Sequence, residues 1–287
     1  MRRALPAFLA FAVLAGCKST PLPPDQLSTE EEEWMLQVSD ELWKYETART
    51  SGLEGDQSDA KHRMMRIAED ENELLAKALH CNDWRARKIA AGALGFAERD
   101  DVIGMLIDVV QNDPDLEARK GALWGLAAKG SEQTPVDSIV LLLSDPDAET
   151  RLLALGTLAK VLRRNIDKGA LPRVLELLGD PDWKVRGQAA LVLARVGRRD
   201  TIKPIVEKPL KDENATVRLH AVGALEVISH EECIDPLVGA LTDPDPRVAD
   251  TANRSLEILT GQKFGKEPEK WAFWWKKRQE LGMGLDH

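Results

Sequence analysis

The sequence has few of the residues from which catalytic and metal sites are usually built. It contains five histidines, and none stands at a metal-ligand spacing from another histidine or from a cysteine. It also lacks a glycine-rich phosphate loop, a nucleophile elbow and a Walker-type motif. We therefore expect a protein that is not an enzyme and that holds no metal and no cofactor.

Tyrosine and phenylalanine are scarce, with one and five copies, and alternating strand-like runs are absent from the sequence. The 287 residues are 43% hydrophobic and 30% charged. This composition is typical of a soluble all-α protein with enough apolar residues for a continuous core.

Positive charge is also in short supply, since 39 Lys and Arg residues face 48 Asp and Glu residues, for a net charge of -9. An acidic chain of this kind disfavours broad binding to nucleic acid or to anionic lipid. We expect no nucleic-acid partner, and no small-molecule substrate is evident.

What the chain does have is one pattern repeated six times: an acidic turn, then an arginine early in an Ala/Leu-rich helix. Alanine stands three residues after each reference position, and leucine seven residues after it. A repeat of 31 to 35 residues indicates a solenoid. The six reference residues are Arg87, Arg119, Arg151, Arg186, Arg218 and Ala249.

Each repeat is predicted to be a pair of antiparallel helices. The residue four positions before each reference residue is an aspartate or asparagine, which can accept a backbone N–H bond as the N-cap of the second helix. Proline, which is tolerated in a first helical turn, marks the first helix at Pro172, Pro204 and Pro236. The predicted N-caps are Asp83, Asp115, Asp147, Asp182, Asn214 and Asp245.

The motif Asp-Pro-Asp-x-x-x-Arg followed by Ala and Leu resembles the HEAT repeat in its short, phycobilisome-lyase-like bacterial variety, over about residues 61–261. The resemblance implies a right-handed α-solenoid of about six hairpins. It also implies that each arginine bonds an aspartate of the next repeat, with Cys81 and Ala249 breaking this ladder at its ends. The implied partners are Asp113, Asp145, Asp180, Asp212 and Asp243.

The first residues are typical of an export signal, assigned to residues 1–16. Arg2 and Arg3 precede a short apolar run that ends in Leu14-Ala15-Gly16-Cys17. These last four residues resemble the bacterial lipobox, which implies cleavage before Cys17 and lipidation of that cysteine. The alternative is an ordinary signal or an uncleaved anchor with an incidental cysteine. Residues 17–29 are predicted to be a Pro-rich tether.

The segment 30–58 is predicted to be an N-terminal helix, from about 30 to 49 and opened by a capping box, followed by a loop. The solenoid is assigned to residues 59–261, and a long helix over about 59–80 begins it. A 35-residue spacing between Arg151 and Arg186 predicts an enlarged loop at 163–169, which is either a functional insertion or a tolerated solvated loop.

Several side chains are candidates for contact with a protein partner. Trp84 and Trp183 share one repeat position, where they either anchor a partner or pack over the groove between repeats. Cys81 and Cys233 lie about five repeats apart and are too distant to form a disulfide. The candidate binding face on the second helices comprises Trp124, Lys160, Gln188, Arg195 and His220.

Residues 262–287 are predicted to form a Trp-rich capping helix. Trp271, Trp274 and Trp275 share one helical face, which can cover the open end of the last repeat. The alternative is an interfacial helix, because basic residues surround these aromatics. The tail resembles a tryptophan-rich element that follows HEAT arrays in some bacterial envelope proteins.

These observations favour a lipid-anchored protein of the bacterial cell envelope that binds protein partners as a scaffold and meets the membrane through its N-terminal lipid. It would face the periplasm, with the outer membrane favoured because Lys18 differs from the aspartate that retains lipoproteins inside in some bacteria. The alternatives are an accessory or assembly factor for an envelope enzyme complex and a chromophore-lyase-like enzyme.

Overall fold

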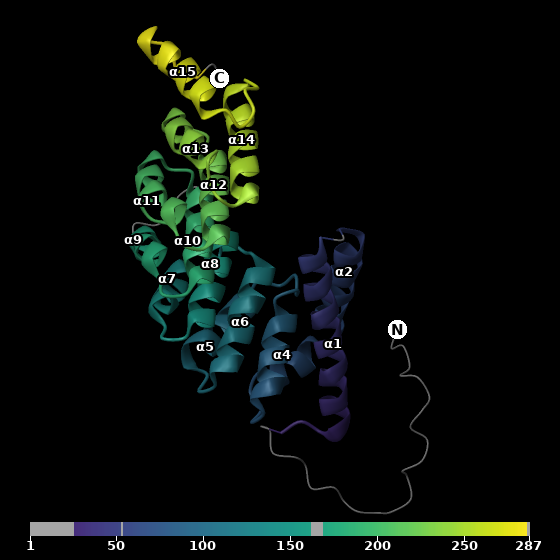
Figure 1. Ribbon diagram of the computed structural model, residues 1–287. Helices are drawn as coiled ribbons and strands as arrows, with labels where there is room; N and C mark the ends of the chain where they lie inside the picture. The colour runs from purple at the N-terminus through teal and green to yellow at the C-terminus, as the bar shows by residue number, and fades with distance from the viewer. Residues whose placement is uncertain (1–25, 53, 162–168, 286–287) are drawn as a thin grey trace, which may run out of the picture.

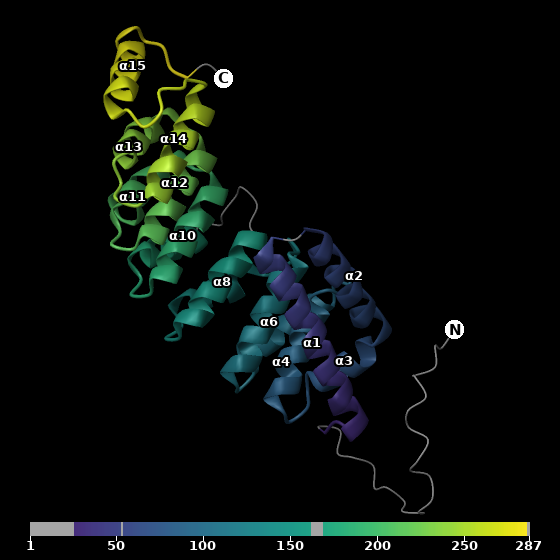
Figure 2. The same cartoon turned by 45° about the vertical axis from the view of Figure 1, so that its right-hand side comes forward.

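The computed structural model describes residues 26–52, 54–161 and 169–285, and these form a curved stack of helical hairpins (Figures 1 and 2). All regular structure within these ranges is helical, with fifteen α-helices and five short 3-10 helices. The chain is thus an all-α solenoid, as predicted. The signal segment, Cys17 and most of the tether lie outside the described residues, as does the predicted loop apart from Gly169.

The N-terminal helices stand beside the array. Helix α1 (Thr29–Ser51) begins with the predicted capping box, in which Ser28 N donates to Glu31 Oε2 at 2.7 Å and Glu31 N donates to Ser28 Oγ at 3.2 Å. It ends at Gly52, whose φ of 72° only glycine adopts readily. Helix α2 (Glu54–Asp70) follows after this short break, so the predicted loop over residues 51–58 is wrong.

The predicted long helix over residues 59–80 is also divided. Helix α2 ends at Asp70 and α3 (Asn72–Ala78) continues after a bend at Glu71, whose φ of -119° and ψ of 26° are not helical. Backbone hydrogen bonds run across the bend, because Glu71 N donates to Ile67 O and Leu75 N donates to Glu71 O. The first hairpin of the array is therefore α3 with α4.

Six hairpins follow one another, beginning with α3 and α4, and in the other five the first helix lies on the outer side and the second on the inner side (Figure 1). The second helices are α4 (Trp84–Leu94), α6 (Leu116–Lys129), α8 (Ala148–Val161), α10 (Trp183–Val196), α12 (Ala215–Ile228) and α14 (Pro246–Thr260). The later first helices are α5 (Val102–Asn112), α7 (Val136–Val140), α9 (Ala170–Glu176), α11 (Ile202–Glu207) and α13 (Ile234–Ala240). The 3-10 turns are η1 (Leu141–Ser144), η2 (Leu177–Gly179), η3 (Arg199–Thr201), η4 (Pro209–Lys211) and η5 (Glu231–Cys233).

The second helices begin where the capping residues predict. The side chains of Asp83, Asp115, Asp182, Asn214 and Asp245 each accept a backbone N–H two residues further on. Asp147 serves α8 in a similar way, accepting from Thr150 N at 2.8 Å. Pro172, Pro204 and Pro236 each fall in the first turn of α9, α11 and α13, where a missing N–H costs little.

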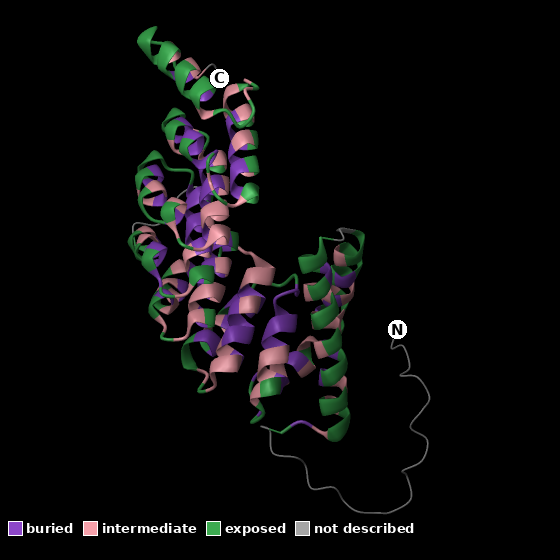
Figure 3. Cartoon of the chain, in the orientation of Figure 1, coloured by how far each residue is buried: buried purple, intermediate pink, exposed green. Residues whose placement is uncertain are grey.

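The core runs along the seam between the two layers of helices (Figure 3). The alanine three residues after each reference position and the leucine seven after it are at most 1% exposed in all six repeats. Cys81 and Cys233 are buried free thiols, as expected from their separation. Alanine at the seam lets the helices approach closely, and leucine fills the space between them.

The second helices line the concave side of the curved array, and α1 and α2 lie on that side at the N-terminal end (Figure 1). Helix α15 (Pro268–Glu280) closes the other end and packs against α13. Within the described ranges, no residue belongs to a helix long and apolar enough to span a bilayer.

Candidate functional site

Arginine–aspartate pairs join successive hairpins along one edge of the array. Arg87 Nε donates to Asp113 Oδ2 at 2.7 Å and Arg87 Nη2 to Asp113 Oδ1 at 2.9 Å, and both side chains are largely buried. Burial alone would raise the pKa of Asp113, but the hydrogen bonds from Arg87 and from Asp115 N lower it below its usual value. The same two-pronged pairs join Arg151 to Asp180, Arg186 to Asp212 and Arg218 to Asp243.

The predicted fifth pair, Arg119 with Asp145, is absent from the described residues. Arg119 Nη1 donates instead to the carbonyl of Asp113 in its own hairpin, at 2.9 Å. The next residue, Lys120, crosses this junction, with Nζ 2.6 Å from Glu149 and 3.1 Å from Asp147. The prediction for Asp145 is wrong because the neighbouring lysine supplies the positive charge that joins α6 to α8.

The residues five and nine positions after each reference residue lie on the concave face of the second helices. We call this set of residues the concave strip. At the fifth position glycine alternates with a larger residue, in the order Gly92, Trp124, Gly156, Leu191, Gly223 and Arg254. At the ninth position stand Phe96, Ala128, Lys160, Arg195, Val227 and Ile258. At the fifth position, we call each glycine, together with the larger residue at the same position of the next repeat, a seat. The strip has three seats, namely Gly92 with Trp124, Gly156 with Leu191, and Gly223 with Arg254.

Helix α1 fills the first seat. A Cβ atom on Gly92 would lie 3.4 Å from Leu42 Cδ1, so the side chain of Leu42 rests directly on this glycine. The ring of Tyr45 makes edge contacts with Phe96 and Trp124, at centroid distances of 4.9 and 6.0 Å. The N-terminal helix is therefore bound to the concave face as an additional layer over the first two repeats.

The five residues predicted for the binding face all lie on the concave side, but they differ in accessibility. Trp124 is partly covered by Tyr45, and His220 is half-buried against Gly187. Gln188 is also half-buried, whereas Lys160 and Arg195 are exposed. Arg195 Nη1 donates to the carbonyl of Ala159 at 2.7 Å, which holds its guanidinium beside Lys160 at the end of α8.

Sequence analysis missed two exposed apolar side chains of the strip. Val227 on α12 and Ile258 on α14 are 62% and 63% exposed and occupy the same repeat position on adjacent helices. The alternation of glycine with larger residues at the fifth position was the signal that could have drawn attention to this strip. The alternation alone does not show that these residues form one surface, because that depends on how the helices are packed.

Trp84 and Trp183 contribute less to a partner surface than their shared position suggested. Trp84 is half-buried, and Trp183 is 38% exposed. Each carries a neighbouring cation over its ring, Arg85 at 4.7 Å from the Trp84 centroid and Lys184 at 5.9 Å from the Trp183 centroid. Both tryptophans thus have intramolecular partners.

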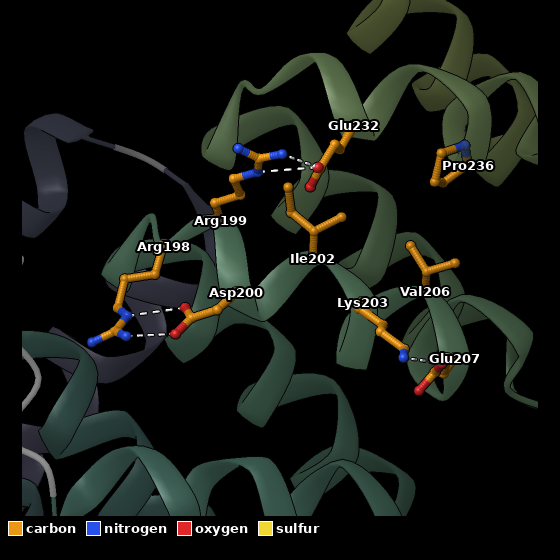
Figure 4. A pocket seen from close by; sticks show the side chains of 9 residues that line it. All are labelled: Arg198, Arg199, Asp200, Ile202, Lys203, Val206, Glu207, Glu232 and Pro236. Atoms are coloured by element: carbon orange, nitrogen blue, oxygen red, sulfur yellow. Dashed lines mark hydrogen bonds and ion pairs between the residues drawn. The ribbon is translucent and has the colours of Figure 1, made fainter.

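An open depression of about 900 Å³ lies on the outer side, between α11 and α13 (Figure 4). Its apolar floor includes Ile202, Val206 and Pro236. The cations on its rim are already paired, since Arg198 Nε donates to Asp200 at 2.9 Å and Arg199 bonds Glu232. Lys203 similarly approaches Glu207. This depression therefore offers a ligand no uncompensated charge.

The C-terminal helix covers the end of the last hairpin with two of its tryptophans. Trp271 and Trp275 are 0% and 5% exposed, and Trp271 Nε1 donates to the carbonyl of Gly265 at 2.7 Å. Phe264 packs edge-on against Trp271. These buried rings favour the capping role over the interfacial alternative.

No cluster of His, Cys, Asp and Glu side chains within residues 26–52, 54–161 and 169–285 is arranged to hold a metal ion. His230 accepts a backbone N–H from Glu232 and so caps η5.

Comparison with known proteins identifies the repeats. Residues 136–208 and 202–269 match the family model of HEAT repeats. No curated protein matches the sequence. Among solved structures, Escherichia coli YibA is 19% identical, with a TM-score of 0.55 over 88% of this chain and 98% of YibA. A Kap121p mutant is 18% identical, with a TM-score of 0.58 over 71% of this chain and 25% of that one.

These solved structures show likeness of fold alone. The HEAT-repeat match covers residues 136–208 and 202–269, and the fold of the solved structures agrees with an α-solenoid. This kind of fold is commonly a scaffold for binding proteins.

Proposed function

We propose that this chain is a lipid-anchored scaffold of the bacterial cell envelope that binds a protein partner on its concave face. The observation that carries the binding role is the concave strip. Over α8 to α14 it presents the exposed side chains Lys160, Arg195, Val227 and Ile258, whereas over α4 a helix already covers it. A concave surface with apolar and charged side chains suits a protein ligand better than a small molecule.

The lipid anchor is proposed from the sequence around Cys17. A lipobox-like run after a basic start and a short apolar segment supports cleavage and acylation at this cysteine. Two or more acyl chains hold a protein stably on a membrane. We place the protein on the periplasmic side of the envelope, at the outer membrane.

A binding role also accounts best for the chemistry of the surface. The short repeats resemble the phycobilisome-lyase-like variety, but the chain offers no residues that we can match to a chromophore pocket. The outer depression between α11 and α13 carries only paired charges. Among the described residues, neither the concave strip nor the outer depression contains an arrangement that resembles an acid–base pair or an activated nucleophile.

The anchor is tested by replacing Cys17 with Ser and following detergent partitioning of the expressed protein. We expect the variant to leave the detergent phase while its circular dichroism matches that of the unchanged chain. A variant that still enters the detergent phase would refute lipidation at this residue.

The binding role is tested by affinity purification from solubilised membranes. A scaffold should recover a protein partner in a stable ratio near one to one, while substoichiometric clients would indicate an assembly factor instead. Absence of any partner, with the protein folded and membrane-bound, would contradict both. The control is the Arg173→Glu/Lys203→Glu variant, which reverses two exposed charges on the outer side and should recover the same partner, because it leaves the concave face unchanged.

A further inference from the structure

Helix α1 shows what kind of ligand the concave strip can hold, because it is an amphipathic helix seated on that strip. Its buried side includes Met35 and Val38, which are 2% and 1% exposed. Over Thr29–Ser51 it carries seven acidic and two basic side chains. The first seat therefore holds an acidic amphipathic helix, with Leu42 on the glycine and Tyr45 beside the larger residue.

The second seat, Gly156 with Leu191, repeats the arrangement of the first but has nothing bound to it from the described chain. Apart from the backbone of its own helix, nothing would lie within 4 Å of a Cβ atom on Gly156, in contrast to the close contact of Leu42 at Gly92. Leu191 is half-buried and stands where Trp124 stands in the first seat. A side chain can thus approach the backbone of α8 as Leu42 approaches that of α4.

The charge around the second seat is opposite to that of the whole chain. Lys160 and Arg195 flank the seat at the ninth position, and the hydrogen bond from Arg195 to the Ala159 carbonyl holds its guanidinium at the backbone next to residue 160. Helix α10 contains no acidic residue, and of its three basic residues Arg186 is paired with Asp212, which leaves Lys184 and Arg195 exposed in a chain with a net charge of -9. Two exposed cations beside an apolar seat would attract an acidic helix and disfavour a basic one.

We propose that the second seat, formed by Gly156 and Leu191 between Lys160 and Arg195, binds an acidic amphipathic helix of a partner protein. This inference rests on the proposed binding function and names the chemistry of the partner. It follows from continuity with the surface that α1 already occupies and from the charge of the seat. A helix that lays an apolar face on a groove is a common mode of protein recognition.

The probe is a fluorescent synthetic peptide with the sequence of residues 29–51, titrated by anisotropy into the chain from Lys18 to His287. We expect saturable binding, and weaker binding by a scrambled peptide of the same composition. Lys160→Glu/Arg195→Glu should weaken binding at least tenfold, while the control Arg173→Glu/Lys203→Glu should leave it within twofold. Rising salt should weaken binding, because both cations are exposed.

The sharpest variant is Gly156→Trp, which fills the second seat as Trp124 fills part of the first. Because no neighbouring element lies within 4 Å of the new Cβ, the variant should keep its circular dichroism and should not melt below the unchanged chain, yet it should bind the peptide at least tenfold more weakly. Absence of saturable binding would overturn the proposal. Equal binding of the peptide by Gly156→Trp and by the unchanged chain would also overturn the proposal. Binding that is lost in Gly92→Trp but not in Gly156→Trp would overturn it too, because the peptide would then displace α1 from the first seat.

Two further outcomes separate this inference from the general function. A partner recovered from membranes that binds the Lys160→Glu/Arg195→Glu variant equally well would leave the scaffold role standing and overturn the second seat. Sedimentation with phosphatidylglycerol vesicles that depends on the same two cations would assign the seat to a membrane surface and also overturn the proposal.

Discussion

The first and second seats of the concave strip have similar sequences but different surroundings, and the difference shows how one repeat can serve either packing or binding. At the first, helices α4 and α6 meet backbone to backbone: a Cβ atom on Gly125 would lie 2.3 Å from the carbonyl oxygen of Ala91. Helix α1 then covers Gly92. At the second, a Cβ atom on Gly156 would meet nothing within 4 Å. A glycine at a helix contact is thus a packing requirement in one place and open surface in another.

The largest expected effect is at the closed end, for Gly125→Ala. The added methyl group would collide with the main chain of α4, which cannot move aside as a flexible side chain would. We expect a loss of about 2 kcal/mol or more in the free energy of unfolding, as for other overpacked cores. Urea denaturation measures it. Gly223→Ala on the open part of the strip is the control, and equal midpoints for the two variants would contradict the close approach of α4 and α6 at Gly125.

The next effect compares two junctions through their arginines. Arg151→Ala leaves the largely buried carboxylate of Asp180 without its guanidinium partner, at a cost of about 1 to 3 kcal/mol. Arg119→Ala removes hydrogen bonds to the carbonyls of Asp113 and, at 3.5 Å, Pro114, while Lys120 still joins the helices, so we expect about 1 kcal/mol or less. The urea midpoints of the two variants give the comparison. A larger shift for Arg119→Ala would show that the lysine does not replace the missing pair.

How far the sequence predicts this molecule can be judged from the same residues. Capping aspartates and the seam alanines and leucines follow from local chemistry repeated at a fixed spacing. The arginine–aspartate pairs are implied by the resemblance to HEAT repeats, and four of the five are present. Arg119 and Asp145 satisfy that pattern equally well, but whether they meet depends on how α6 and α8 are placed and on the competing Lys120. Likewise, the spacing of Leu42 and Tyr45 predicts a helix with an apolar side without indicating which surface that side covers.

A smaller, pH-dependent effect is expected at His220, on the open part of the concave side. Its Nδ1 is buried against Gly187, and burial lowers the pKa of the imidazole by more than the backbone hydrogen bond to Gly187 raises it. Because the folded pKa lies below the unfolded value, stability is full above about pH 6.5 and falls as the pH drops below it. The melting temperature should therefore fall as the pH is lowered from 7.5 to 5.5.

His220→Leu separates this effect from the other titrating groups. The pKa values of Asp113, Asp212 and Asp243 are lowered, so these carboxylates stay ionised in that window, and their contribution is lost only below about pH 4. The variant should lose part of the decrease in melting temperature between pH 7.5 and 5.5. An unchanged pH dependence would assign it to other residues.

The smallest effect, and the one of opposite sign, is expected for Gly156→Ala at the second seat. Glycine inside a helix costs about 0.5 to 1 kcal/mol relative to alanine, because the unfolded chain has more freedom to lose. No neighbour lies within 4 Å of the new methyl group, so this gain should appear as a higher urea midpoint. A helix seated on Gly156 as Leu42 sits on Gly92 would meet that methyl group, and the gain should shrink when the peptide of residues 29–51 is present at saturation. A loss of stability in the free protein would mean that the second seat is closed, and the contrast between the two seats would fail.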